Sequence, residues 1–397
     1  ALLVALVRAL VAPQIGAAEA WPVVLLTAAL GVCDKTLFLA FRSEHYWTTF
    51  LCFALAQDWI PGAKAVYLAL WFWAGVSKLN AHFPAVVCVM TSNSPVARWP
   101  AIRRLMYRHY PDDSRPSRLA HWAAHAGTVL ELGVPTVLFF ATGEPWLQVG
   151  MVLMLGLHLF ITSNVPMGVP IEWNFVMVYG AVALCWQYPE VSVLSVQPPL
   201  LAACLCVMLI ALPVLGNLFP ERVSFLLAMR FYAGNWAYGV WLFEKSAFEK
   251  LERLTKSAAL LHKQLERFYD PALARGLIGK VMGFRLMHLH GRALPLLVPR
   301  AVQRFEDYEY LDGELVAGLA LGWNFGDGHL HNETLLRAIQ AQCGFEPGEL
   351  RCIFVESQPI LGKTLSYRIV DAVTGVVEQG QLPVAELLTR QPWAASV

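Results

Sequence analysis

Charged residues are scarce in this sequence of 397 residues: they make up 15% of the chain, whereas 57% of the residues are hydrophobic. A soluble globular domain usually carries about 25% charged residues, so this composition indicates that lipid is the solvent of much of the chain. It excludes an intrinsically disordered protein, a collagen-like fibre and a disulfide-stapled secreted module. Because 30 Lys and Arg residues balance 29 Asp and Glu residues, nucleic-acid binding has no electrostatic support.

Several motifs that carry chemistry in other proteins are also absent. None of the eight cysteines lies in a CxxC pair, so neither a zinc site nor a disulfide framework is indicated. The sequence has no Gly-rich phosphate loop, no GxSxG and no dinucleotide fingerprint. Most of the cysteines lie in apolar runs, where we expect them to be small buried hydrophobic residues.

Long apolar runs predict where the chain crosses a membrane, because a spanning helix needs about 20 mostly apolar residues. We predict an α-helical integral membrane bundle of seven to nine spans, followed by a small cytoplasmic α+β domain. The candidate spans are residues 1–12 (a partial span), 22–41, 46–60, 62–79, 118–142, 146–163, 171–188 and 198–219. The chain begins at Ala1 rather than Met, so we expect that an N-terminal part is missing.

Arginine and lysine gather in two segments that set the expected orientation. Basic loops lie on the cytoplasmic side of a membrane, and four candidate spans separate the two segments, so both are expected on that side. The first segment carries Arg98, Arg103, Arg104, Arg108, Arg115 and Arg118, and the second carries Lys245, Lys250, Arg253, Lys256, Lys263 and Arg267. The protein is therefore expected in the cell (inner) membrane, with its C-terminal domain in the cytoplasm.

Composition divides the chain into a polytopic membrane domain (1–220), interfacial and amphipathic helices (221–305) and a small soluble α+β domain (306–397). Residues 223–244 are rich in aromatic side chains, which is typical of an interfacial or re-entrant helix. Residues 245–280 have the spacing of an amphipathic helix.

The soluble domain carries alternating strand and helix signals. GELVAGLALGWNF is predicted to be a strand, and Glu333 to Gln342 a helix. RCIFVES, LSYRIVDA and GVVEQGQL are predicted to be strands, the last two joined by a turn at AVTG.

The segment WFWAGVSKLNAHF, residues 71–83, places Lys78 at the end of a long apolar helix. Ala74 and Gly75, one turn earlier, are small enough to let another helix approach closely. A lysine within a span is costly, so Lys78 is a candidate functional residue. A desolvated lysine can act as a base, whereas the structural alternative is that Lys78 extends to the lipid headgroups.

A second candidate lies in AHWAAHAGTVLELGVP, residues 120–135. His121 and His125 share one helix face, and Glu131 follows on the same helix. A HxxxH pair can hold a metal, but the additional histidine boxes of membrane di-iron desaturases are absent. The alternatives are hydrogen bonding between helices, or a polar pocket lined by His125 and Glu131, because ionisable groups in spans face the bundle interior.

A third candidate is GLHLFITSNVPMGVPIEWNF, residues 156–175. His158 lies in a span, and Asn164 precedes a stretch broken by Pro and Gly, whose backbone must line protein or a cavity at this depth. Glu172 opens the next helix, where its structural role is a favourable interaction with the helix dipole. We predict a cofactor-binding role for Asn164, Glu172 and Trp173.

Two HxH pairs, His288 with His290 and His329 with His331, are candidate metal ligands. An HxH pair on a strand projects both imidazoles to one face. The structural alternative for the second pair is a loop that enters the helix at residue 333, with Asn332 as its N-cap.

Taken in order, WFWAGVSKLNAHF, HAGTVLELG and LHLFITSN…GVPIEWNFVMV resemble the membrane domain of vitamin-K-dependent gamma-glutamyl carboxylases, also called the horizontally transferred transmembrane domain. The resemblance covers residues 45–185. In that family the lysine of the AGxxKL helix is proposed as the base that deprotonates vitamin K hydroquinone, so the resemblance implies this role for Lys78. It also implies site positions for His125, Glu131 and His158. The large lumenal substrate-binding region of the carboxylases is absent.

Nearly the whole chain is also similar to a bacterial family of transmembrane proteins of unknown function, common in mycobacteria. The segments that carry this similarity are SKLNAHFPAVVCVMTSNSPV, YPDDSRPSRLAH, PMGVPIEWN, MRFYAGNW, GWNFGDGHLHNE and RQPW.

Two functional hypotheses follow. In the first, the protein is a membrane enzyme acting on a quinol, isoprenoid or lipid substrate, with Lys78 as general base and His125, Glu131 and His158 positioning the ligand or relaying protons. In the second, it is a non-catalytic subunit or scaffold of a bacterial membrane complex. The expected partners are membrane lipids and other subunits of such a complex.

Overall fold

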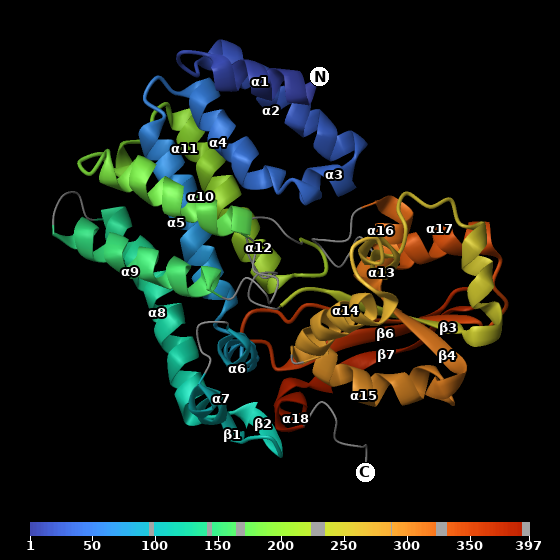
Figure 1. The fold of residues 1–397 in the computed structure, drawn as a ribbon. Helices are drawn as coiled ribbons and strands as arrows, with labels where there is room; N and C mark the ends of the chain where they lie inside the picture. The colour runs from blue at the N-terminus through green and yellow to red at the C-terminus, as the bar shows by residue number, and fades with distance from the viewer. Residues whose placement is uncertain are drawn as a thin grey trace. The chain divides into compact units, whose positions relative to one another are not determined.

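The computed structural model describes residues 1–94, 99–140, 145–163, 171–223, 235–286, 288–322 and 332–390, which form two compact units (Figure 1). The first unit comprises Ala1–Leu79, Asn93–Arg98 and Trp122–Arg230, and the second comprises Asn80–Ser92, Trp99–His121 and Phe231–Val397. Each unit is thus assembled from segments far apart in the sequence, and the predicted boundary at residue 306 falls inside the second unit.

The first unit is built of helices. They are α1 (Leu2–Val11), α2 (Ala17–Cys33), α3 (Lys35–Ala40), α4 (Ser43–Leu55), α5 (Ile60–Ser77), most of α8 (Arg118–Phe140), α9 (Trp146–Thr162), α10 (Ile171–Gly180) with the π-helical η2 (Ala181–Trp186), η3 (Val193–Ser195), and α11 (Pro199–Cys206), η4 (Val207–Ala211) and α12 (Leu212–Leu218), which follow one another without a break.

Helix α5 forms the centre of the first unit. Fifteen of its 18 residues are buried, and its core side chains pack against α4, α8, α9, α10, η2, α11 and η4. Glycines allow these close approaches: a Cβ atom on Gly62 would lie 2.7 Å from the Cys52 sulfur, and one on Gly180 would lie 2.5 Å from the Tyr67 ring. This all-round burial explains why α5 is apolar on every side.

Two helices among the described residues are long and apolar enough to cross a membrane: α8, with 23 residues, and the continuous helix Pro199–Leu218, with 20. Within their most apolar windows, only 33% and 28% of the residues are buried inside the protein. A core helix of a soluble protein would be mostly buried, so the outward apolar surface of these two helices favours contact with lipid.

Several predicted spans are shorter in the structure. The predicted span 22–41 divides at Asp34, whose carboxylate accepts a hydrogen bond from the Leu37 amide (2.9 Å) and caps α3. Helix α4 has 13 residues, or about 20 Å of length, against a hydrocarbon core of about 30 Å. The predicted seven to nine spans are therefore not confirmed.

The second unit contains a five-stranded antiparallel sheet in the order β4-β3-β5-β6-β7. Its strands are β3 (Tyr238–Glu244), β4 (Tyr308–Asp312), β5 (Leu350–Val355), β6 (Thr364–Asp371) and β7 (Gly375–Pro383). A two-stranded hairpin, β1 (Tyr107–His109) and β2 (Asp113–Pro116), also belongs to this unit. The helices are α6 (Phe83–Asn93), α7 (Pro100–Met106), η6 (Lys245–Arg253), α13 (Leu261–Leu265), α14 (Pro271–Leu286), α15 (Leu289–Ala301), η7 (Phe305–Asp307), α16 (Gly313–Leu321), α17 (Glu333–Cys343) and α18 (Val384–Thr389).

Both faces of the sheet are covered, as the alternation along β3 shows. Tyr238, Val240 and Leu242 pack with α15 and α18, whereas Trp241 and Phe243 pack with η6, α16 and α17. Figure 1 shows α15 and α17 on opposite sides of the sheet. The core of the second unit therefore consists of two apolar layers, one on each face.

Two predictions for this unit are wrong. Residues 238–244, predicted as part of an interfacial helix, form the interior strand β3, which lies between β4 and β5. A strand buried on both faces has a continuous apolar run, which periodicity does not distinguish from a helix. Residues 313–321, predicted as a strand, form α16. The Asp312 side chain accepts a hydrogen bond from the Glu314 amide (2.7 Å), and Gly322, with φ of 76°, ends the helix in the left-handed conformation.

Other predictions for this unit are confirmed. Strands β5, β6 and β7 and helix α17 lie where the sequence predicted them, and the AVTG turn ends at Gly375, whose φ is 83°. The amphipathic segment 245–280, in contrast, is divided among η6, α13 and the first part of α14. Asn332 caps α17 as expected, accepting a hydrogen bond from the Thr334 amide (2.9 Å).

Candidate functional site

Lys78 and Glu131 form an ion pair in the first unit, in which the Lys78 ammonium donates a hydrogen bond to Glu131 Oε2. Lys78 caps the C-terminus of α5, and Glu131 projects from α8. Gly75 lets the two helices approach, because a Cβ atom there would lie 2.9 Å from the Leu132 side chain and 3.1 Å from the Glu131 backbone. The lysine side chain is 12% exposed and the glutamate side chain 4%, so the pair is accessible mainly from its lysine end.

A chain of hydrogen bonds runs from Trp71 on α5 through His158 on α9 to Asn174 on α10. Trp71 Nε1 donates to His158 Nε2 (2.9 Å), and His158 Nδ1 lies 2.8 Å from Asn174 Oδ1. Since the indole can only donate, Nε2 is the acceptor, which assigns the proton of a neutral ring to Nδ1. All three side chains are buried, and their hydrogen bonds join three helices.

The ion pair and the hydrogen-bonded chain meet on one side of α5, because Lys78 follows Trp71 by seven residues, or about two helical turns. The charges of Lys78 and Glu131 also act on His158, which agrees with one polar region. Trp173, next to Asn174, is buried and makes an edge contact with the His45 ring of α4, with centroids 5.6 Å apart. We call this region the α5 polar cluster; it comprises Lys78, Glu131, Trp71, His158, Asn174, Trp173 and His45.

The structure brings together only some of the predicted site residues. His125 is exposed on α8, where Ala124 and Thr128 define the buried face, so it lies outside the α5 polar cluster. His121 is also exposed, and its Nδ1 lies 2.8 Å from the backbone oxygen of Ser117. Asn164 and the side chain of Glu172 lie outside the described residues.

Sequence reasoning missed Trp71, Asn174 and His45. Trp71 and Asn174 lie within segments that were singled out, but their polar atoms were not considered as partners of His158. Another buried group, Lys64 at the start of α5, was also missed; its ammonium donates hydrogen bonds to the backbone oxygens of Tyr188 and Val191 (2.8 Å for Val191). Polar atoms within apolar helices were the available signal, because such atoms need partners when buried.

In the second unit, His288 and His290 are buried and stacked nearly parallel, with centroids 5.5 Å apart. Trp236 packs on both rings, at 5.0 and 4.9 Å, and Tyr238 packs on His290 at 4.4 Å. This is aromatic packing, and the described residues contain no group of three or more His, Cys, Asp or Glu side chains placed to hold a metal. His329 and His331 lie outside the described residues.

A second buried charge cluster lies beside this aromatic group. Arg285 donates hydrogen bonds to Asp312 (2.6 Å) and to Glu314, so one guanidinium forms ion pairs with two carboxylates. Burial raises the pKa of Glu314 to about 7, because Arg285 offsets desolvation only in part and Asp312 adds a like charge. Burial alone would lower the pKa of Arg285, but the two carboxylates raise it above its ordinary value.

Comparison with known proteins places the whole chain in one family. The model of a family described as "Transmembrane protein of unknown function (DUF3556)" matches residues 6–397. No curated protein and no solved structure matches the chain. The comparisons therefore bear out the transmembrane assignment, but they give no support to the carboxylase resemblance or to a mycobacterial relationship.

Proposed function

Since the chain belongs to this family of transmembrane proteins, we propose that its first unit is a membrane enzyme that accepts a proton from a lipid-soluble hydroxyl compound, such as a quinol. The observation that carries the proposal is the ion pair of Lys78 and Glu131 within the α5 polar cluster. Ionisable groups in membrane helices are costly, and they mark sites of proton transfer or ligand binding more often than lipid-facing positions do.

The ion pair changes the role expected for Lys78. A lysine paired with a carboxylate holds its proton, so Glu131 is the group able to accept one. When the substrate hydroxyl transfers its proton to Glu131, its O–H bond breaks, the electron pair stays on the substrate oxygen, and Lys78 stabilises the resulting anion. The total charge of the site is unchanged by this step, which keeps its cost low in a medium of low dielectric constant.

His158 is a positioning residue in this proposal. Its two ring nitrogens are already engaged by Trp71 and Asn174, so it does not compete with Glu131 for the substrate proton. The hydrogen bonds fix α9 and α10 against α5, which supports a rigid arrangement of the ion pair.

The alternative is a non-catalytic subunit of a membrane complex. It is favoured by the hydrogen bonding of Trp71, His158 and Asn174 to one another, which is typical of polar side chains that hold membrane helices together. In that case Lys78 and Glu131 are a further pair of the same kind.

Binding of a short-chain quinol, decylubiquinol, to the purified full-length chain tests the proposal. We expect the quinol to raise the melting temperature of the wild type and to have no effect on Glu131→Gln. Lys35→Met, which removes an exposed lysine of the first unit, is the matched control and should respond like the wild type.

The charge-swapped variant Lys78→Glu/Glu131→Lys separates the two functions. It keeps an ion pair but moves the ammonium group to α8, so an enzyme loses quinol binding whereas a structural pair is restored. Full binding by the swapped variant, or no binding by the wild type, would overturn the enzymatic proposal in favour of the subunit.

We also propose that the second unit lies on the cytoplasmic side of the inner membrane. The support is the positive charge of residues 98–118, together with the folding of Trp99–His121 and Phe231–Val397 into one unit, since one compact unit lies on one side. Labelling of single cysteines placed at Arg104 and Arg337 in a cysteine-free chain tests this. Protection of both from an impermeant reagent in intact cells is expected, and labelling of both would place the unit outside.

A further inference from the structure

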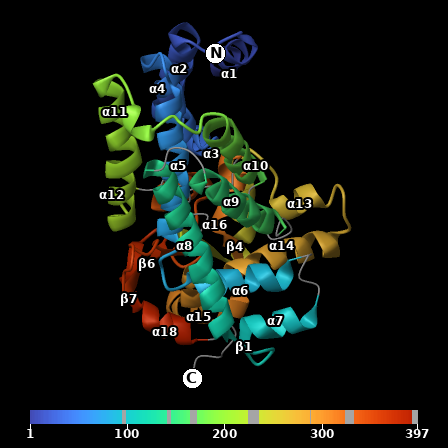
Figure 2. The same ribbon diagram turned by 90° about the vertical axis from the view of Figure 1, so that its left-hand side faces the viewer.

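The segment Trp99–Leu119 carries a strongly basic and aromatic surface that the proposed enzyme does not use. It consists of α7, the β1–β2 hairpin and the first residues of α8, and Figure 2 shows α7 and β1 near the start of α8. We propose that this segment, which we call the arginine hairpin, binds the anionic headgroups of phospholipids. The proposal is independent of the chemistry at Lys78.

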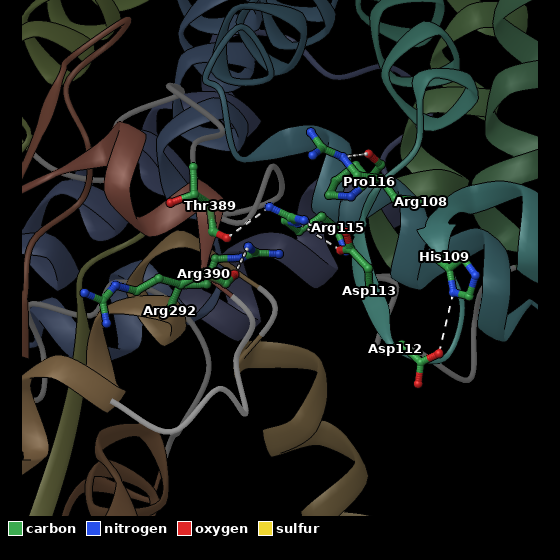
Figure 3. Close-up of polar contacts among 9 residues, drawn as sticks. All are labelled: Arg108, His109, Asp112, Asp113, Arg115, Pro116, Arg292, Thr389 and Arg390. Atoms are coloured by element: carbon green, nitrogen blue, oxygen red, sulfur yellow. Dashed lines mark hydrogen bonds and ion pairs between the residues drawn. The ribbon is translucent and has the colours of Figure 1, made fainter. Parts of the chain in front are cut away.

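Charge is the first observation that supports this inference. The arginine hairpin contains five arginines and two aspartates. Arg115 is neutralised by Asp113, through contacts of 2.9 Å and 2.6 Å, and Figure 3 shows the two side chains together. The remaining four arginines are exposed, and no carboxylate of the described residues pairs with them. These are Arg103, Arg104, Arg108 and Arg118.

Exposed apolar side chains on the same segment favour lipid over a free anion. Trp99 is 74% exposed, Leu105 57%, Tyr110 44% and Leu119 47%. Tryptophan and tyrosine beside arginine are typical of the headgroup region, where the ring enters the acyl boundary and the guanidinium binds phosphate. A soluble anion would need the arginines alone.

Chain continuity is the second observation. The arginine hairpin leads directly into α8, one of the two helices long and apolar enough to cross a membrane, and Arg118 is the first residue of that helix. A basic cluster that immediately precedes a spanning helix lies at the height of the headgroups. The position of the arginine hairpin, as well as its charge, therefore favours a phospholipid headgroup as its ligand.

The arginine hairpin is also held in a fixed shape. Ser117 donates hydrogen bonds to the backbone oxygens of Met106 (2.9 Å, from its amide) and Leu105 (2.5 Å, from its hydroxyl). Arg115 reaches the backbone oxygen of Thr389 at the end of α18 (3.4 Å), as Figure 3 shows. The arginines are thus presented by a folded element, so that little order has to be gained on binding.

The test compares two triple variants of the full-length chain, purified and delipidated in a neutral detergent. Arg103→Gln/Arg104→Gln/Arg108→Gln removes three charges from the arginine hairpin. The control, Arg267→Gln/Arg275→Gln/Arg337→Gln, removes three exposed arginines elsewhere in the second unit. Dioleoyl phosphatidylglycerol or dioleoyl phosphatidylcholine is then added, and bound lipid is measured by native mass spectrometry and by the shift in melting temperature.

We expect phosphatidylglycerol, but not phosphatidylcholine, to bind and stabilise the wild type and the control. Each arginine near an anionic surface contributes about five-fold in binding, so the hairpin variant should bind roughly 100-fold more weakly. If that variant fails to fold, Arg104→Gln and Arg108→Gln alone are each expected to weaken binding about five-fold. Equal binding by both triple variants, equal binding of the two lipids, or the same stabilisation by inorganic phosphate would overturn the proposal.

Discussion

Replacing Lys78 with methionine is expected to destabilise the protein strongly. Methionine keeps the length of the side chain but leaves the carboxylate of Glu131, which is 4% exposed, without its ammonium partner. Breaking a buried ion pair by removing one partner costs about 3–5 kcal/mol. At roughly 2–4 °C for each kcal/mol, the melting temperature should fall by about 10 °C.

The double variant Lys78→Met/Glu131→Leu is expected to recover most of this loss. Replacement of both charges by apolar side chains removes the stranded carboxylate together with the cost of desolvating the pair, and such replacements are often neutral or stabilising. A double-mutant cycle with the two single variants should therefore give a coupling energy of at least about 2 kcal/mol.

Thermal unfolding of the wild type and the three variants in one detergent measures this energy, with Lys35→Met as the control for loss of an exposed lysine. The reasoning is refuted if Lys78→Met melts at or above the wild-type temperature. That result is expected of a neutral, desolvated lysine, which is the state that the carboxylase resemblance implies for a base.

Two further predictions concern the helix packing of the first unit and the charge cluster of the second unit. Gly75→Ala should lower the free energy of unfolding by about 1–3 kcal/mol, because its Cβ atom would lie 2.9 Å from Leu132. Gly133→Ala is the control: its Cβ atom would have open space around it, so it should be neutral or stabilising. Equal melting temperatures of the two variants would contradict the predicted clash. Glu314 has a folded-state pKa of about 7 against an ordinary 4.5, so the folded state binds more protons and stability falls as the pH rises between these values, by about 3 kcal/mol in all. Glu314→Gln, which keeps a hydrogen-bonding group beside Arg285, should remove this dependence from melting curves recorded at pH 5 to 8, and an unchanged slope would show that another group is responsible.

A comparison of two strands of the sheet, β7 and β3, shows which sequence signals were sufficient to predict a strand and which were not. Strand β7 lies at the edge of the sheet and has one buried residue, Leu382, but the AVTG turn marks where it begins, and its position was predicted correctly. In β3, six of seven residues are buried, so the period of two that identifies a strand is lost. The capping residues of α16, Asp312 and Gly322, were present in the sequence but were outweighed by the apolar run between them.

Helical periodicity explains why Glu131 lies in the α5 polar cluster and His125 does not. Glu131 shares the buried face of α8 with Ala124 and Thr128, at a spacing of seven and three residues, and that face meets α5. His125 is six residues from Glu131, which places it on a different side of the helix. The grouping of His125 with Glu131 was therefore excluded by spacing alone, before any tertiary contact is considered.

Pairing between distant segments is the part that a single sequence does not determine. Lys78 belongs to the first unit and finds its partner 53 residues later, whereas Asn80, two residues further on, belongs to the second unit and accepts a hydrogen bond from the Leu361 amide (3.0 Å), 281 residues away. The apolar residues around Lys78 in the sequence mark it as costly to bury, but its chemical role depends on its ion-pair partner. An unpaired lysine is a candidate base, whereas a lysine paired with Glu131 holds its proton and can only stabilise an anion. The function proposed for the first unit therefore follows from one long-range contact. The double-mutant cycle tests that contact, and quinol binding by the charge-swapped variant decides between the enzyme and the subunit.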